Sequence, residues 1–225
     1  MKKSAPFAVI ALSALALTAC SGGGSGATGG PEVGTEPPVS FSAAEWALPV
    51  EPQGTWLNSM ANDTVRVDFY QLGIEAATED SAWADTETDE PLFVAGDDVV
   101  LLQTVITNVG EEEVVLPHGQ GDGLFDFAEN EYLQVSPESY LTGLLEEYGV
   151  PSDSRDFDSP AVQEQTGNDN MALAAGESAS YGEVYWYAGE QDYTMGFSID
   201  RVVDGEVPDY EDHIISGNVP LPIEP

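Results

Sequence analysis

The chain has almost no positive charge. Lysine and arginine together number 5 against 41 aspartate and glutamate residues, which gives a formal net charge of −36 at pH 7 over 225 residues. Two of these cations, Lys2 and Lys3, stand at the extreme N-terminus, so the rest of the chain carries only Arg66, Arg155 and Arg201. Nucleic acids and anionic lipid surfaces are bound through cationic side chains, so this composition excludes an electrostatic partnership with either of them.

Cysteine and histidine are also scarce. The single cysteine, Cys20, excludes an internal disulfide bond, and two histidines, His118 and His213, without a Cys/His cluster do not support a zinc site. Glycine-rich phosphate loops and HExxH helices are also missing from the sequence. The segment around Ser178 resembles part of a nucleophile elbow but lacks the second glycine, so we interpret Ser178 as a turn residue. We expect a protein without enzyme activity and without a cofactor.

The N-terminus carries a short apolar run. Residues 5–17 are apolar but too few to span a bilayer, and they follow a positive stretch at residues 1–3. This order is typical of a secretory signal peptide. Leu17, Thr18, Ala19 and Cys20 follow directly, and this ending resembles the lipobox of bacterial lipoproteins.

The lipobox resemblance implies a lipid modification and a location in the cell. Residues 1–19 would be removed, and Cys20 would become the first mature residue, with a diacylglycerol on its thiol and an acyl chain on its amine. Two or three acyl chains anchor a protein stably, so we expect it on the extracytoplasmic face of a cell membrane. A Gram-positive cell is favoured; in a Gram-negative cell, Ser21 would permit export to the outer membrane. The alternative is a spare thiol after ordinary secretion.

Two further segments complete the expected organisation. Residues 20–40 hold the cysteine and a stretch rich in glycine, proline and serine, which is typical of a flexible linker. The whole chain is 42% apolar, and residues 41–225 are expected to form one folded domain with a packed core.

Periodic apolar patterns predict strands in this domain. Residues 64–70 alternate, which predicts a half-buried strand with Arg66 and Asp68 on its solvent face, and residues 99–107 are apolar on both faces, as in a central strand. We expect a hairpin between this central strand and residues 113–116, and a second hairpin between residues 180–187 and 193–199. One short helix is predicted at 137–148, followed by a long loop at 152–170.

These segments also resemble a known group of domains. The phrase GDDVVLLQTVITNVGEEEVVLP at residues 96–117 is similar to the strand, Asn-x-Gly turn and strand of bacterial immunoglobulin-like lipoprotein domains. Residues 173–178 are similar to a later turn of the same group, with Ala175 where proline is often found. The resemblance implies an antiparallel immunoglobulin-like β-sandwich with one short inserted helix. It supplies no catalytic residues, because members of the group mostly lack an assigned activity.

Calcium is the one metal with a chemical argument, because carboxylates and loop carbonyls are its ligands. The densest acidic segments are residues 121–126 with Glu129 and Glu131, and the group Asp153, Asp156 and Asp158. Neither has the spacing of an EF-hand, so we expect solvated loops and no specific metal site. His213, beside Glu211 and Asp212, is expected at the surface. The four tryptophans (Trp46, Trp56, Trp83 and Trp186) belong either to the core or to a carbohydrate-binding face.

The sequence therefore predicts a lipid-anchored, extracytoplasmic, monomeric binding or interaction module without catalysis. It touches the membrane through its N-terminal lipid, binds no nucleic acid, and has an extracellular protein or small molecule as its partner. Two alternatives stay open at this point. One is a solute-capturing or enzyme-accessory lipoprotein with an aromatic-lined pocket, and the other is a weak calcium-binding surface domain.

Overall fold

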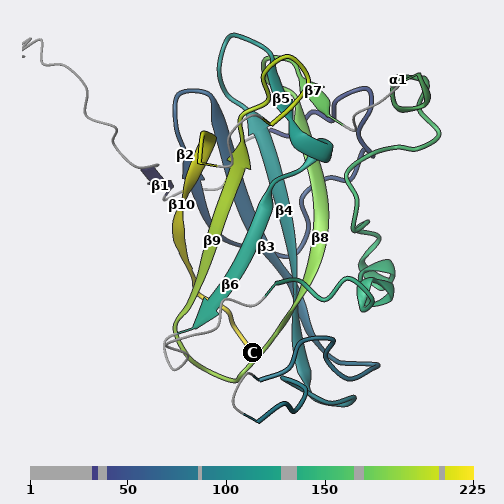
Figure 1. The fold of residues 1–225 in the computed structure, drawn as a ribbon, viewed down its shortest axis with the longest axis vertical. Helices are drawn as coiled ribbons and strands as arrows, with labels where there is room; N and C mark the ends of the chain where they lie inside the picture. Colours follow the sequence, from purple (N-terminus) through teal and green to yellow (C-terminus); the bar gives the residue numbers. More distant parts are fainter. Residues whose placement is uncertain (1–31, 35–39, 86–87, 128–135, 165–169, 208–210) are drawn as a thin grey trace, which may run out of the picture.

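A computed structural model describes residues 32–34, 40–85, 88–127, 136–164, 170–207 and 211–225, and shows two facing sheets (Figure 1). The larger sheet has the order β1-β2-β3-β4-β8, the smaller one β10-β9-β6, and β5 pairs with β7. The bounds are β1 (Glu32–Gly34), β2 (Thr55–Ala61), β3 (Val65–Ala76), β4 (Asp98–Asn108), β5 (Val114–Leu116), β6 (Asp122–Phe127), β7 (Met171–Leu173), β8 (Ser178–Trp186), β9 (Tyr193–Asp200) and β10 (His213–Leu221). All these strand pairs are antiparallel, so the predicted all-β sandwich is confirmed.

The core lies between the two sheets. Inward positions on both sheets carry large apolar side chains that are fully or nearly fully buried, among them Met60, Phe69, Leu102, Phe125, Tyr181, Tyr185, Met195, Phe197 and Val219. Alternate residues of a strand point to opposite faces, so each strand sends every second side chain into this layer. The aromatic rings interlock: Phe69 meets Phe197 edge-on at 5.6 Å, and Phe125 stacks on Tyr193 at 4.8 Å.

Side chains close both lateral sides of the sandwich. On one side, the amide groups of Asn58 and Asn62 donate hydrogen bonds to carbonyl oxygens of β10, at 3.0 Å and 2.8 Å. On the other side, the Tyr181 hydroxyl of β8 donates to the Gly121 carbonyl just before β6, at 3.0 Å. These bonds satisfy edge groups that have no strand partner, and they hold the two sheets in one fixed relation.

Both predicted hairpins are wrong, although the strands themselves exist. β4 pairs with β3 and β8, whereas β5 pairs with β7. Likewise β8 belongs to the larger sheet and β9 to the smaller one. Each short connection therefore passes from one sheet to another. Alternation of apolar residues specifies which face of a strand is buried, and it carries no information about which neighbour the strand pairs with.

The predicted helix is shorter than expected. The 3-10 helix η2 spans Thr142–Tyr148 and ends at Gly149, whose φ of 66° is left-handed. The chain just before η2 is not helical. Its Glu138 amide donates a hydrogen bond to the Val184 carbonyl at the edge of β8. Leu141 and Leu145 then pack on the outer face of the larger sheet, in a second apolar cluster with Leu101 and Val184.

Other short elements occupy the connections. The 3-10 helix η1 (Pro117–Gly119) links β5 to β6, and the four-residue helix α1 (Pro160–Gln163) lies in the predicted long loop. Ser159 caps α1 through its hydroxyl group. Among the helices that the structure describes, none combines the length and the apolar character needed to cross a bilayer.

One strand lies where the sequence predicted a linker. β1 falls within residues 20–40, and it pairs with β2 so that Glu32, Val33 and Gly34 lie opposite Ala61, Met60 and Ser59. β1 therefore covers the last three residues of β2, whose outer backbone groups would otherwise lie at the edge of the sheet. The neighbouring linker residues 20–31 and 35–39 lie outside the described part of the chain.

Candidate functional site

One end of the sandwich gathers two clefts, and we call it the loop end. The β2–β3 turn, the β4–β5 turn and the start of the β9–β10 connection meet there and line a cleft of about 520 Å³. Four exposed carboxylates belong to its lining, and we call them the acidic rim: Asp63, Glu111, Glu112 and Glu113. The one basic residue in the lining, Arg201, forms an ion pair of 3.1 Å with Asp212. The cleft is therefore a region of negative potential.

The second cleft at this end contains a histidine. It has a volume of about 330 Å³ and is lined mainly by the η1 segment and the first residues of β6, together with Asp200 and Val207. We call it the histidine cleft. His118 has φ of 51° there, a left-handed conformation that few non-glycine residues adopt, and Gly119 follows with φ of 78°. Strain of this kind persists only where the surrounding structure imposes it.

Both histidines of the chain interact with the acids of this cleft. The ring Nδ1 of His213 lies 2.8 Å from Oδ1 of the nearly buried Asp200. Partial burial raises the pKa of the Asp122 carboxyl, and the charge of Asp200 raises it further, whereas His118 lowers it. The His213 ring therefore contacts a carboxylate in the wall of this cleft.

A third acid lies beside the histidine cleft, in the side of the sandwich between β8 and β6. Glu183 occupies an inward position of β8, and the Tyr185 hydroxyl donates to its Oε2 at 3.0 Å. Burial raises the pKa of the Glu183 carboxyl to about 8, and this outweighs the hydrogen bond from Tyr185, which lowers the pKa. Gly123 provides the room, because a Cβ there would lie 2.7 Å from the Tyr185 hydroxyl.

The arrangement suits recognition of positive charge. The loop end presents the acidic rim, Asp122 and Asp200 on a rigid scaffold. Carboxylates are hydrogen-bond acceptors that bind ammonium and guanidinium groups. Among the described residues, Asp200 is the hydrogen-bond partner of the His213 ring.

The predicted acidic loops have a different structure. Residues 122–126 belong to strand β6, so their side chains alternate between the two faces of a sheet. Glu129 and Glu131 lie outside the described residues. Asp153 forms a two-point ion pair with Arg155, and an oxygen of Asp156 accepts a hydrogen bond from the Asp158 amide. Among the residues that the structure describes, no three His, Cys, Asp or Glu side chains are grouped so that they could hold a metal ion.

The four tryptophans have separate places. Trp46 is buried and donates to the Ala172 carbonyl, and Trp186 meets Phe127 edge-on at 5.2 Å. Trp83 is exposed in the β3–β4 connection, and Trp56 is half-buried on β2. Neither loop-end cleft includes a tryptophan in its lining.

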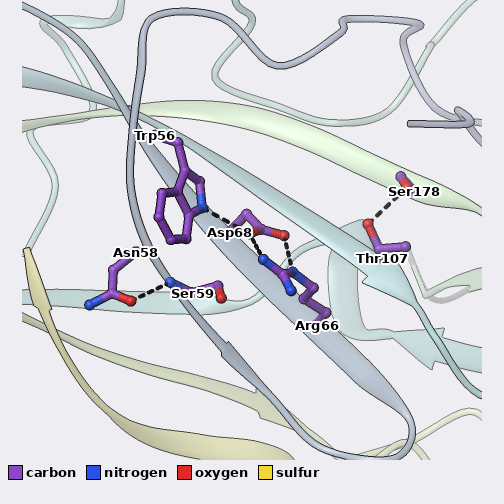
Figure 2. Close-up of polar contacts among 7 residues, drawn as sticks. All are labelled: Trp56, Asn58, Ser59, Arg66, Asp68, Thr107 and Ser178. Atoms are coloured by element: carbon purple, nitrogen blue, oxygen red, sulfur yellow. Dashed lines mark hydrogen bonds and ion pairs between the residues drawn. The ribbon is translucent and has the colours of Figure 1, made fainter. Parts of the chain in front are cut away.

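Trp56 belongs to a charge network on the outer face of the larger sheet (Figure 2). The Arg66 guanidinium grips the Asp68 carboxylate at two points, 2.8 Å and 2.7 Å, and the Trp56 indole donates to the same carboxylate at 3.0 Å. Asp68 is completely buried, so the prediction of a solvent face at Asp68 is wrong. Three donated hydrogen bonds compensate the carboxylate for the water it has lost, which identifies a structural ion pair.

Ser178 also differs from expectation. It begins β8 instead of lying in a turn, its hydroxyl is 2.9 Å from that of Thr107, and it is fully buried (Figure 2). The turn lies just before it, where Gly176 has φ of 82°. The predicted lipid site at Cys20, with Leu17, Thr18 and Ala19, lies outside the described residues and stays a prediction.

The sequence analysis named His118 and the segment containing Asp122, but it did not predict that they lie together with Asp200 in one cleft. Asp122 follows His118 by four residues, whereas Asp200 is far along the chain, and the three share no motif spacing. Glu183 did leave a signal, because it has the same parity as Tyr181 and Tyr185 and is therefore an acid at an inward strand position. His213 was expected at the surface and is half-buried against Asp200 instead.

Comparisons with known proteins give two similar structures, both from Bacillus subtilis. No protein-family profile and no curated protein matches the chain. The "putative lipoprotein" ycdA is 13% identical with a TM-score of 0.36, over 76% of this chain and 39% of ycdA, so the chain spans about two fifths of that protein. The yjhA protein is 9% identical with a TM-score of 0.40, over 76% of this chain and 100% of yjhA.

Proposed function

We propose that the mature chain is a lipid-anchored extracytoplasmic binding module that acts without catalysis, and that its loop end binds a cationic partner. One observation carries the second part: the acidic rim and the histidine cleft lie at the same end of one sandwich. Loops held by a rigid scaffold are the usual binding surface of such folds. The lipobox at residues 17–20 supports the anchor.

Charge decides which kind of partner fits. Beyond Lys3 the chain has no lysine, and each of its three arginines is paired with a carboxylate: Arg66 with Asp68, Arg155 with Asp153, and Arg201 with Asp212. A second copy of the chain would bring further carboxylates to the acidic rim, and like charges repel. The partner is therefore a basic segment of another molecule, and the protein itself stays monomeric.

The two alternatives have less support. An aromatic-lined solute pocket would place rings in the loop-end clefts, but carboxylates, a histidine, glycines and aliphatic side chains line them. Calcium would need several oxygen ligands converging on one point, whereas the carboxylates of the acidic rim are all exposed to solvent. Divalent cations would then act as weak, general charge screens.

Calorimetry with a short oligoarginine peptide tests the binding proposal. The protein is the mature chain with Cys20→Ser, expressed without its signal peptide. Combined substitution of Glu111, Glu112 and Glu113 by glutamine should weaken binding by about tenfold or more, which corresponds to about 1.4 kcal/mol. A control with the exposed Glu79, Glu146 and Glu147 changed to glutamine removes the same charge elsewhere and should lose less than about threefold, since distant charges are screened.

Equal losses of peptide affinity in the two triple variants would mean that binding depends only on the net charge of the protein. This result would contradict a site at the loop end. Calcium should give weak heats at many sites. A single tight calcium site that is lost on Asp122→Asn with Asp126→Asn would instead establish the calcium alternative.

The anchor has its own test. Cys20→Ala should move the protein from the membrane pellet to the soluble or unprocessed fraction, because the thiol that receives the lipid is gone. The fold of residues 41–225 should stay the same, as judged by circular dichroism. Wild-type protein whose N-terminus carries no acyl mass would contradict the anchor.

A further inference from the structure

The strand β1 joins the linker to the sandwich at a defined place. Its register sets Glu32 beside Ala61 and Gly34 beside Ser59, so the chain that comes from Cys20 reaches β1 at the end of β2. Ala61 precedes the β2–β3 turn, which contains Asp63 and Thr64 of the acid-rimmed cleft. Neighbouring strands lie about 5 Å apart and two residues add at most about 7 Å, so the linker arrives next to the acidic rim.

The fit between β1 and β2 depends on a glycine. A Cβ at Gly34 would lie 1.9 Å from the Ser59 hydroxyl oxygen and 3.3 Å from the Ser59 Cβ, so even the smallest side chain is in conflict with β2. Ser59 is fully buried although it belongs to the strand next to the edge, and its hydroxyl has no hydrogen-bond partner among the described residues. β1 thus approaches β2 closely at this point.

The number of residues between Cys20 and β1 limits how far β1 can lie from the lipid anchor. Twelve peptide units separate Cys20 from Glu32, and a fully extended chain covers about 3.5 Å per residue, so β1 lies at most about 40 Å from the anchored cysteine. Among the described residues after β1, the next backbone hydrogen bond with the sandwich is at Ser42, whose carbonyl accepts the Ser178 amide. Twenty-two units separate Ser42 from Cys20, which would allow about 75 Å.

We infer that Glu32–Gly34 act as a latch that fixes the linker to the edge of the larger sheet and holds the loop end close to the membrane. The inference rests on the proposed lipid anchor for its membrane part, and on the described strand pairing for its latch part. The acidic rim then meets its basic partner near the lipid surface, while the β3–β4 connection at the opposite end of the sandwich stands farther out (Figure 1).

Gly34→Val is the variant that opens the latch, and Gly30→Val is its matched control four positions earlier in the linker. Lipidated protein is placed in phosphatidylcholine vesicles that contain an acceptor dye on the lipid headgroup. A donor dye is attached through a cysteine introduced at Glu111 for the loop end, or at Thr88 for the opposite end. Wild type should give more energy transfer from position 111 than from position 88, and Gly34→Val should lower the transfer from both positions.

The control should keep the wild-type values. Equal transfer from the two positions in wild type, or identical transfer in Gly34→Val and Gly30→Val, would overturn the inference. Hydrogen exchange of the lipid-free chain tests the latch alone: Gly34→Val should speed amide exchange within residues 59–61 at least tenfold, and Gly30→Val should not. Unchanged exchange would overturn the latch even if the protein is anchored. Failure to join vesicles would overturn the proposed anchor and leave the exchange experiment to decide the latch.

Discussion

An acidic side chain, Glu183, occupies an inward position of strand β8. Glu183 lies among the core tyrosines of β8, where an apolar side chain would be the ordinary choice. The nearby Asp122 raises the pKa of Glu183, as burial does more strongly. An acid placed in this way stabilises the fold while it keeps its proton and destabilises it once ionised.

Glu183→Gln should therefore change how stability depends on pH. The pKa of Glu183 is about 8 in the folded protein against 4.5 normally, so the folded state holds a proton that the unfolded state releases between these values. The free energy of unfolding falls as pH rises through this window. Glutamine should remove a loss on the order of 2 kcal/mol between pH 5 and pH 8, after a discount for solvent at the half-buried carboxyl.

Urea unfolding at both pH values measures this difference. Glu146→Gln is the control, because it removes one exposed negative charge and so accounts for the change in net charge. A pH slope that is the same in Glu183→Gln and in wild type would contradict the protonated state of Glu183.

At the scale of elements, the sequence predicted where the strands lie along the chain better than it predicted which strands pair. Strands β3, β4, β8 and β9 were predicted close to their places, because alternation and β-branched runs are local signals. Their pairing depends on contacts between segments far apart in the chain, and both hairpins were assigned to the wrong neighbours. The acidic loop at 121–126 failed for a related reason: its glycines and acids resemble a turn, but pairing with β9 makes it strand β6.

The candidate site was harder to predict than the fold. The four acids of the acidic rim come from two connections, the β2–β3 turn and the β4–β5 turn, and the histidine cleft joins η1 to the ends of β6 and β9. With 41 acids in the chain, spacing alone could not select them. Only the fold shows which carboxylates lie together.

Gly182→Ala tests how η2 is held on the larger sheet. A Cβ at Gly182 would lie 2.9 Å from Val150 and 3.0 Å from Leu145, so these side chains must move away from the sheet. Overpacking of this kind costs roughly 1–3 kcal/mol. Gly143→Ala is the matched control within η2, since nothing lies within 4 Å of the added carbon. Thermal melts should show a clear loss for the first variant and little change for the second.

At the scale of the whole molecule, charge is distributed without balance. Each of the three arginines forms an ion pair with a carboxylate of the same chain, so the remaining acids leave a large excess of negative charge. A field of one sign attracts basic partners over a distance of about 10 Å at moderate ionic strength, and salt weakens it. Net charge alone would attract such a partner to every face. The loop end differs because its carboxylates line clefts.

Mapping where a basic peptide binds tests this central claim most directly. Amide chemical shifts of the isotope-labelled mature chain with Cys20→Ser are followed by NMR during addition of the oligoarginine peptide at low salt. We predict that the large shifts fall at residues 62–64, 110–114, 118–122 and 200–201, that they saturate together, and that they weaken as salt is added. Shifts of similar size spread over acidic residues of the whole surface, or concentrated at the β3–β4 connection, would contradict a binding site at the loop end.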